Sequence, residues 1–255
     1  EYTFDLSEIE KKPFHFGGYL EFRPVFLDLD RDSLLYNLRF YDLEEGESIA
    51  EYNFNALLDF SYDKGIFSAK IRTNTDITKS FSGWSHETTL YEAFLSVKQS
   101  LSFHLDFGKK RMKWGKGYAF NPAAFIDRAK NPNDPDLALE GFVVISVDYI
   151  KSFKGKLKTI TLTPVLLPVY DHINSDFGEW NKLNFGGKVY FLLYDTDIDI
   201  MFLSGGSGPA RYGIDFSRNM TSNFEIHAEL AYIPDYSKKV IDQSGSVIEE
   251  NYANT

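Results

Sequence analysis

The feature that most constrains the fold of this chain is an alternation of apolar and polar side chains with a period of two. Successive side chains of a β-strand point to opposite faces of a sheet, so each alternating run predicts a strand with one apolar face. The clear runs lie at residues 51–62, 67–73, 91–97, 101–108, 143–149, 185–193, 198–202, 212–216 and 223–232. Less regular runs at 14–26, 34–42 and 156–166 bring the expected total to about twelve strands, with no clear helix.

Composition excludes several classes of protein. The chain has 255 residues, enough for one large all-β domain, and no apolar run approaches the roughly 18 residues of a transmembrane helix. It has no cysteine, which excludes disulfides, thiolate nucleophiles and Cys-ligated zinc. A net charge of −10 argues against a nucleic-acid partner, because the neutralisation of phosphates requires a basic surface.

The predicted connections alternate in length. Short turns are expected at 62–65, 98–100, 152–155, 195–196 and 218–221, and longer connections at 76–87, 115–139, 168–182 and 234–248. Short turns on one rim and long loops on the other are typical of outer-membrane barrels. We treat 1–255 as a single domain, with residues 1–12 as an N-terminal extension. The polar segment 249–255 reads as a loop, so we expect further C-terminal strands in the native protein.

A soluble β-sandwich would also alternate, and three features favour a membrane barrel over it. Many runs last about nine to twelve residues, the length needed to cross a bilayer at a tilt. Aromatic residues recur near the ends of the apolar faces, where an interfacial girdle would lie. The apolar faces of the clearest strands carry no charge. The predicted fold is therefore an all-β, transmembrane, antiparallel up-and-down barrel, incomplete at its C-terminus.

The polar faces of these strands supply the candidate pore lining. If the apolar faces contact lipid, the charged and histidine residues of the polar faces point into the lumen. The predicted lumen residues are Lys70, Arg72, His104, Asp106, Lys110, Arg111, Asp148, Lys188, Asp197, Asp199, Arg211, Asp215, Glu225, His227 and Glu229. Strand parity puts Lys110 on the lumen face and Lys109 and Arg111 on the opposite face, unless a bulge at Gly108 shifts the phase.

The most distinctive segment follows the run at 101–108. Five cations fall between positions 109 and 116, at the start of the long connection 115–139. This loop is either folded into the lumen, where it would form a basic constriction that favours anions, or it is the polar end of a strand that meets lipid headgroups. From Gly108 to Gly141 the segment reads Gly-Lys-Lys-Arg-Met-Lys-Trp-Gly-Lys-Gly, then Asn-Pro, Asp-Pro and Glu-Gly.

This pattern resembles that of Gram-negative outer-membrane porin-like proteins, including alginate-export-like barrels and related families of unassigned function. The motif covers about thirty-five residues, and the hairpin layout covers most of the chain. The resemblance implies a β-barrel in the outer membrane of a Gram-negative bacterium. It implies no substrate.

Other constellations are weaker. The acidic run 28–32 has calcium-like spacing but lacks the glycine and glutamate of an EF-hand loop, and 131–136 could at most hold a structural Ca²⁺. The five histidines show no metal-ligand spacing, and nothing links a serine to a histidine. We therefore expect no enzyme, no catalytic residue, no metal and no cofactor.

Three functions remain open from the sequence. The first is an outer-membrane pore for passive or selective passage of small, anionic solutes, with lipid and solute as its partners. The second is an export or electron-transfer conduit that sheaths a lumen-filling partner protein. The third is a soluble β-sandwich binding protein. The sequence leaves a homo-oligomer open.

Overall fold

The computed structural model describes residues 13–41, 48–117, 120–131, 135–204, 206–241 and 246–252. Its described part is almost entirely β-structure, as the alternation predicted. Eleven strands form one antiparallel sheet in consecutive order, and two more form a separate hairpin. Among the described residues, no pairing joins β1 to β11, so the sheet is not closed into a barrel.

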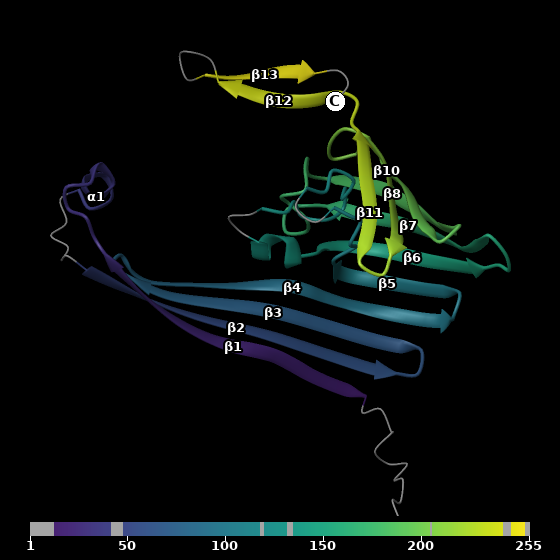
Figure 1. Ribbon diagram of the computed structural model, residues 1–255, viewed down its shortest axis with the longest axis horizontal. Helices are drawn as coiled ribbons and strands as arrows, with labels where there is room; N and C mark the ends of the chain where they lie inside the picture. Colours follow the sequence, from purple (N-terminus) through teal and green to yellow (C-terminus); the bar gives the residue numbers. More distant parts are fainter. Residues whose placement is uncertain are drawn as a thin grey trace, which may run out of the picture. The chain divides into compact units, whose positions relative to one another are not determined.

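The strands are long and their connections are mostly tight (Figure 1). The main sheet comprises β1 (Phe14–Asp28), β2 (Ser48–Lys64), β3 (Phe67–Ser80), β4 (Gly83–Ser100), β5 (Phe103–Lys110), β6 (Phe142–Ser152), β7 (Leu157–Val169), β8 (Lys182–Leu193), β9 (Thr196–Leu203), β10 (Arg211–Thr221) and β11 (Phe224–Tyr232). The separate hairpin comprises β12 (Tyr236–Ile241) and β13 (Val247–Tyr252). The described helices are α1 (Leu34–Arg39) and the 3₁₀ helix η2 (Pro135–Leu139).

Two compact units divide the chain. The first unit comprises Glu1–Tyr62 and Lys70–Tyr91, and the second comprises Asp63–Ala69 and Glu92–Thr255. Within the second unit, the strands from β5 to β11 change direction progressively along the sheet (Figure 1). Strands β2, β3 and β4 contribute residues to both units.

In the first unit, β1 and β2 present an exposed apolar face. The register places Phe16 opposite Phe60 and Phe22 opposite Phe54 on this face. Phe16 is 76% exposed and Phe22 is 63% exposed, far more than an aromatic residue of a soluble core. The other face is polar, since Arg72 pairs with Asp59 there.

The second unit has two faces of opposite character. On one face of β9 and β10, Asp199 and Asp215 lie opposite each other, and both are about 1% exposed. On the other face, Ile200 lies opposite Ile214, and these side chains are 49% and 44% exposed. At these positions of β9 and β10, polar groups are therefore buried and apolar groups exposed, the reverse of the arrangement in a soluble sheet.

Within the region predicted as a strand at 34–42, residues Leu34–Arg39 form helix α1 instead, and residue 42 lies outside the described residues. Ser33 caps this helix, because its hydroxyl accepts a hydrogen bond from the backbone N–H of Leu35 at 3.2 Å. Apolar residues at 34, 35 and 38 recur at helical as well as strand spacing, so the alternation in this stretch was misleading. The expectation of no helix was therefore wrong. The predicted N-terminal extension, residues 1–12, lies outside the described residues.

Several predicted connections are also strand. The expected loop at 76–87 is the end of β3 and the start of β4, joined by a turn at residues 81–82. The hydroxyls of Thr75 and Thr88 lie 3.1 Å apart across this pair, so polar cross-strand contacts continue the ladder where apolar alternation stops. The expected loop at 234–248 and the polar segment 249–255 contain β12 and β13, and β10 runs through the predicted turn at 218–221. The predicted loop at 115–139 falls between β5 and β6, and most of the one at 168–182 falls between β7 and β8, which end at Val169 and begin at Lys182.

Candidate functional site

The segment that follows β5 packs on the polar face of the second unit. Glu229 of β11 holds it there, because its carboxylate accepts hydrogen bonds from the backbone N–H groups of Gly117 and Ala123. A second anchor is the ion pair between the Lys116 ammonium and the Asp199 carboxylate, whose atoms lie 3.0 Å apart. Burial lowers the pKa of Lys116, but the attraction of Asp199 outweighs it and leaves this pKa raised. Two strands far along the chain thus fix the start of the loop.

Asp127 organises the loop from within. Its carboxylate accepts three backbone N–H groups, from Met112 at 3.0 Å, Lys113 at 3.0 Å and Trp114 at 2.6 Å. Burial raises the pKa of Asp127 above its ordinary value, although these three bonds and the nearby Arg111 charge oppose the shift. One acidic side chain therefore satisfies three consecutive donors of an irregular segment that has no strand partner.

Glycine is required where the loop turns back on itself. Gly115 adopts a positive φ of 79°, and a Cβ there would lie 1.8 Å from the Oδ1 atom of Asn121. The Asn121 amide donates to the backbone carbonyl of Trp114 at 3.0 Å. This close approach links the two limbs of the loop.

The loop also carries the apolar core of the second unit. Trp114, Phe125 and Ile126 are each at most 2% exposed. They cluster with buried residues of the sheet, namely Phe142, Val144, Val165, Leu167, Val169, Met201 and Leu203. Burial of a large apolar side chain contributes roughly 1.5–3 kcal/mol, so the loop is bound to the sheet as firmly as a core element.

An ion-pair network closes the far end of the loop. The Arg128 Nε atom lies 2.8 Å from a Glu140 carboxylate oxygen, and its guanidinium also pairs with Asp176 and lies over the Phe142 ring. Lys109 is a second partner of Glu140. Burial would raise the pKa of Asp176, but the Arg128 hydrogen bond and charge outweigh it and leave this pKa lowered.

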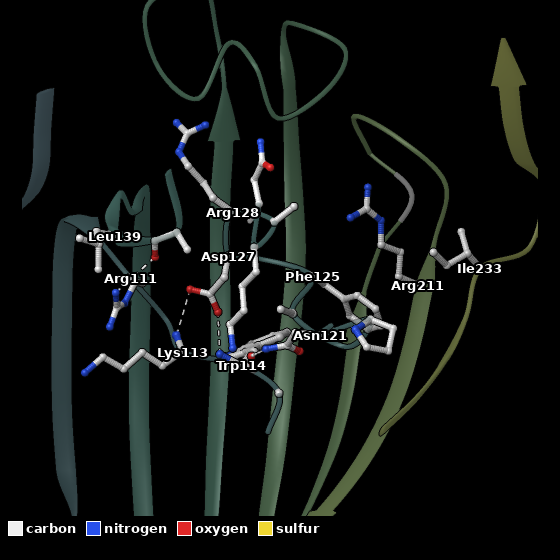
Figure 2. A pocket seen from close by; sticks show the side chains of 17 residues that line it. Arg111, Lys113, Trp114, Asn121, Phe125, Asp127, Arg128, Leu139, Arg211 and Ile233 are labelled. Atoms are coloured by element: carbon white, nitrogen blue, oxygen red, sulfur yellow. Dashed lines mark hydrogen bonds between the residues drawn. The ribbon is translucent and has the colours of Figure 1, made fainter. Parts of the chain in front are cut away.

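A cavity of about 800 Å³ lies beside this loop (Figure 2). Among the described residues, its lining contains five cations and one carboxylate, that of Asp127. The cations are Arg111, Lys113, Arg128, Lys130 and Arg211. Figure 2 shows Arg111 and Arg211 on opposite sides of the site, with Trp114 and Phe125 between them. The lining is therefore basic at its sides and aromatic in the middle.

Most of the predicted lumen residues lie on the loop-bearing face of the second unit. Backbone pairing places them on one face through the register pairs of β5 to β11. These residues are His104, Asp106, Lys110, Asp148, Lys188, Asp197, Asp199, Arg211, Asp215, Glu225, His227 and Glu229. The pairing of β5 with β6 is regular through Gly108, so Lys110 keeps the predicted phase.

The remaining predicted residues lie elsewhere. Arg72 belongs to the first unit, where it pairs with Asp59, and Lys70 lies two positions before it on β3. Arg111 follows β5, lines the cavity and donates to the backbone carbonyl of Ala138 at 3.2 Å. On the loop-bearing face, by contrast, Lys110 pairs with Asp106, which also accepts a hydrogen bond from the Ser96 hydroxyl of β4.

Sequence reasoning missed the residues that shape the loop. Asp127 and Asn121 each bond to the backbone of Trp114, across gaps of thirteen and seven positions, within a segment that has no period. The available signal was compositional: a dense run of cations and glycines followed by Asp127 and Arg128. That signal marks a special segment, but it does not indicate which side chain bonds which backbone group.

Comparisons with known protein families, with curated proteins and with solved structures gave no match to this chain. Within the described residues, no helix has the length and apolar character needed to cross a membrane. In the same residues, no group of three or more His, Cys, Asp or Glu side chains is arranged to hold a metal ion. The resemblance to porin-like barrels therefore stays a prediction from the sequence.

Proposed function

We propose that this chain forms the wall and the constriction of an outer-membrane pore through which small anionic solutes pass. The observation that carries this proposal is the reversed polarity of the sheet, with charges buried beneath a loop and large apolar side chains exposed. In water, contiguous exposed apolar surface of this extent is unfavourable and marks a contact with lipid or another protein. In a bilayer the same face is the stable one.

The exposed face has the composition expected of a lipid contact. In the second unit it carries Ile200, Ile214, Phe216, Ile226 and Leu230, all at least 40% exposed. Tyr212 and Tyr232 lie opposite each other at one end of β10 and β11, with ring centroids 6.4 Å apart. Aromatic pairs at strand ends suit the membrane–water interface, where the ring meets acyl chains and the hydroxyl meets water.

The loop on the polar face supports a narrowed passage. It is anchored by charged groups and by a buried core, so it would restrict a lumen rather than swing freely. A constriction sets selectivity through the charges at its narrowest point, whatever the net charge of the whole protein. The loop cations Arg111, Lys113 and Lys130 give this passage a preference for anions.

The same packing makes a sheath for a partner protein the less favoured alternative. A lumen-filling partner needs the inner face of the wall, and this chain's own loop occupies that face in the second unit. A soluble sandwich is also less favoured, since it requires two sheets packed face to face. The eleven strands here form one sheet in sequential order.

The proposal is tested with two neighbouring substitutions on β11. Ile226→Arg places a charge on the exposed apolar face, which costs about 2–4 kcal/mol near the bilayer midplane. Glu225→Gln is the matched control on the other face, where the Ser217 hydroxyl donates to Glu225 at 2.7 Å and can donate equally to an amide oxygen. We expect Ile226→Arg to lower the yield of membrane-inserted protein at least tenfold and Glu225→Gln to leave it unchanged. Insertion is read by carbonate extraction and flotation with vesicles.

Conductance then separates a pore from other membrane roles. Wild-type protein in a planar bilayer should give ion currents with a reversal potential that favours anions in a salt gradient. Equal insertion of both variants would refute the assigned lipid face. Insertion without conductance would refute the pore and leave the sheath as the function.

A further inference from the structure

We propose that the basic cavity beside the long loop is a saturable binding site for an organic dianion with an aromatic or other flat apolar body. This assignment rests on the proposed function in that it names the solute class of the same passage. The cavity volume of about 800 Å³ falls within the range of small-molecule sites and far exceeds the size of an inorganic ion.

Carboxylates and backbone groups of the protein engage the charged side chains of the cavity to different degrees. The carboxylate of Asp127 is engaged by three backbone N–H groups, and Arg128 is paired with Glu140 and Asp176. By contrast, Arg111 and Lys130 donate to backbone carbonyl oxygens, those of Ala138 and Gly117. A carbonyl satisfies a donor without cancelling its charge, so Lys130 and, beside Asp127, Arg111 keep positive charge that can attract an anion.

Trp114, Pro122 and Phe125 line the cavity and favour a ligand that has a hydrogen-bond acceptor and a flat apolar body. Trp114 is 1% exposed, and its indole N–H has no hydrogen-bond partner among the described residues. A buried donor without an acceptor costs about 1–3 kcal/mol, which a carboxylate oxygen of a ligand would recover. Phe125 and Pro122 line the same region and offer contact to a ring.

Two acidic groups fit the site better than one. In Figure 2, Arg111 and Arg211 lie on opposite sides of the site, and the aromatic side chains lie between them. Arg111 follows β5 while Arg211 begins β10, so the two guanidinium groups are carried by strands that are not neighbours in the sheet. A ligand with an anionic group at each end would engage both, whereas a monoanion engages one.

The experiment measures binding to the detergent-solubilised wild-type protein by isothermal titration calorimetry. The probes are naphthalene-2,6-dicarboxylate, the monoanion 2-naphthoate and the neutral dimethyl ester of the dicarboxylate. We expect the dianion to bind about tenfold more tightly than the monoanion, and the ester to bind more weakly still. Equal affinity for all three would overturn the proposal without any variant. Tighter binding of glycerol 3-phosphate than of the dicarboxylate would assign the cavity to lipid headgroups and overturn it as well.

Variants then locate the site. Arg111→Gln and Arg211→Gln should each weaken the dicarboxylate about tenfold and leave 2-naphthoate less affected, since each removes one end of the clamp. Lys154→Gln, on the exposed turn between β6 and β7, is the control with the same change of charge. Unchanged affinity in both cavity variants would overturn the assignment. Binding without conductance would refute only the proposed pore, and conductance without binding would refute only this inference.

Discussion

Removal of the Asp127 carboxylate is the sharpest test of how the loop is held. In Asp127→Ala, the backbone N–H groups of Met112, Lys113 and Trp114 lose their acceptor together. The N–H of Lys113 is near the surface and can bond to water. The other two lie in partly buried surroundings, and an unsatisfied donor there costs about 1–3 kcal/mol, or roughly 2–6 kcal/mol for the pair. Relief from burying the carboxylate offsets part of this loss, so we expect destabilisation of about 2–4 kcal/mol.

Asp127→Asn separates hydrogen bonding from charge. The bonds from Met112 and Lys113 end on one carboxylate oxygen and the bond from Trp114 on the other. An amide oxygen can keep the first two bonds, but its NH₂ group would face the Trp114 N–H. The expected loss is therefore about 1–3 kcal/mol, smaller than in the alanine variant.

The measurement is equilibrium unfolding in urea, in detergent micelles, followed by tryptophan fluorescence. The emission of buried Trp114 should shift to the red on unfolding. This shift should occur at the lowest urea concentration in Asp127→Ala, at a higher one in Asp127→Asn and at the highest in the wild type. Coincident unfolding curves for all three proteins would refute the view that Asp127 holds the loop together.

The difference in stability between the wild type and Asp127→Asn should depend on pH, in a direction set by the pKa of Asp127. Burial raises the pKa of Asp127, so the folded protein binds its proton more tightly than the unfolded chain does. Its contribution to stability is fully present below the unfolded value of 3.8 and is lost as pH rises through the raised folded pKa. The stability advantage of the wild type over Asp127→Asn should therefore shrink as pH rises above about 4. Asp176 has a lowered pKa and acts in the opposite sense, but it is common to both proteins and cancels.

Three further substitutions probe the polar face. Lys110→Glu reverses the charge of a residue paired with Asp106, so reversal potentials should shift toward cations if this face lines the passage, and an unchanged potential would exclude it. Gly213→Leu should displace the loop, because even a Cβ there would lie 2.9 Å from the Phe125 ring; a lower urea midpoint would show this, and an unchanged one would contradict the packing. Glu229→Ala removes the acceptor of two loop N–H groups and should make the loop more sensitive to protease by at least tenfold, whereas equal cleavage rates would show that the tether is dispensable.

The strands were predictable because their side chains obey a period. Because successive residues of a strand point to opposite faces, a strand with one apolar face has an apolar side chain at every second position, as at Phe224, Ile226, Ala228 and Leu230 of β11. The alternation also separated the two faces correctly, since Asp199 of β9 and Asp215 of β10 are buried while Ile200 and Ile214 on the other face are exposed. Where the period fades, as in β12 and β13 and at the polar ends of β3 and β4, strand was mistaken for loop.

The site was not predictable to the same degree, because it depends on contacts without a period. The hydrogen bond from the Gly117 N–H to the Glu229 carboxylate spans more than a hundred positions, and nothing in either local sequence specifies the other. The same holds for Lys116 and Asp199, whose pairing follows from the way β9 faces the loop. Composition marked the loop as unusual, while its hydrogen bonds emerge only once the sheet has brought its strands together.

The charges of the loop complement those of the sheet face that it covers. Charged side chains on the loop-bearing face, such as Asp199 and Glu229, would be costly to bury under an apolar cover. The segment that covers them brings Lys116 to Asp199 and two backbone N–H groups to Glu229, so a basic, donor-rich loop is what an acidic wall requires. The side chains of Arg111 and Lys130 donate instead to backbone carbonyls, those of Ala138 and Gly117, and Arg111 lines the cavity together with Lys130. An acidic protein can thereby present a basic surface to a solute: the wall neutralises one side of the loop and leaves the other free to select anions.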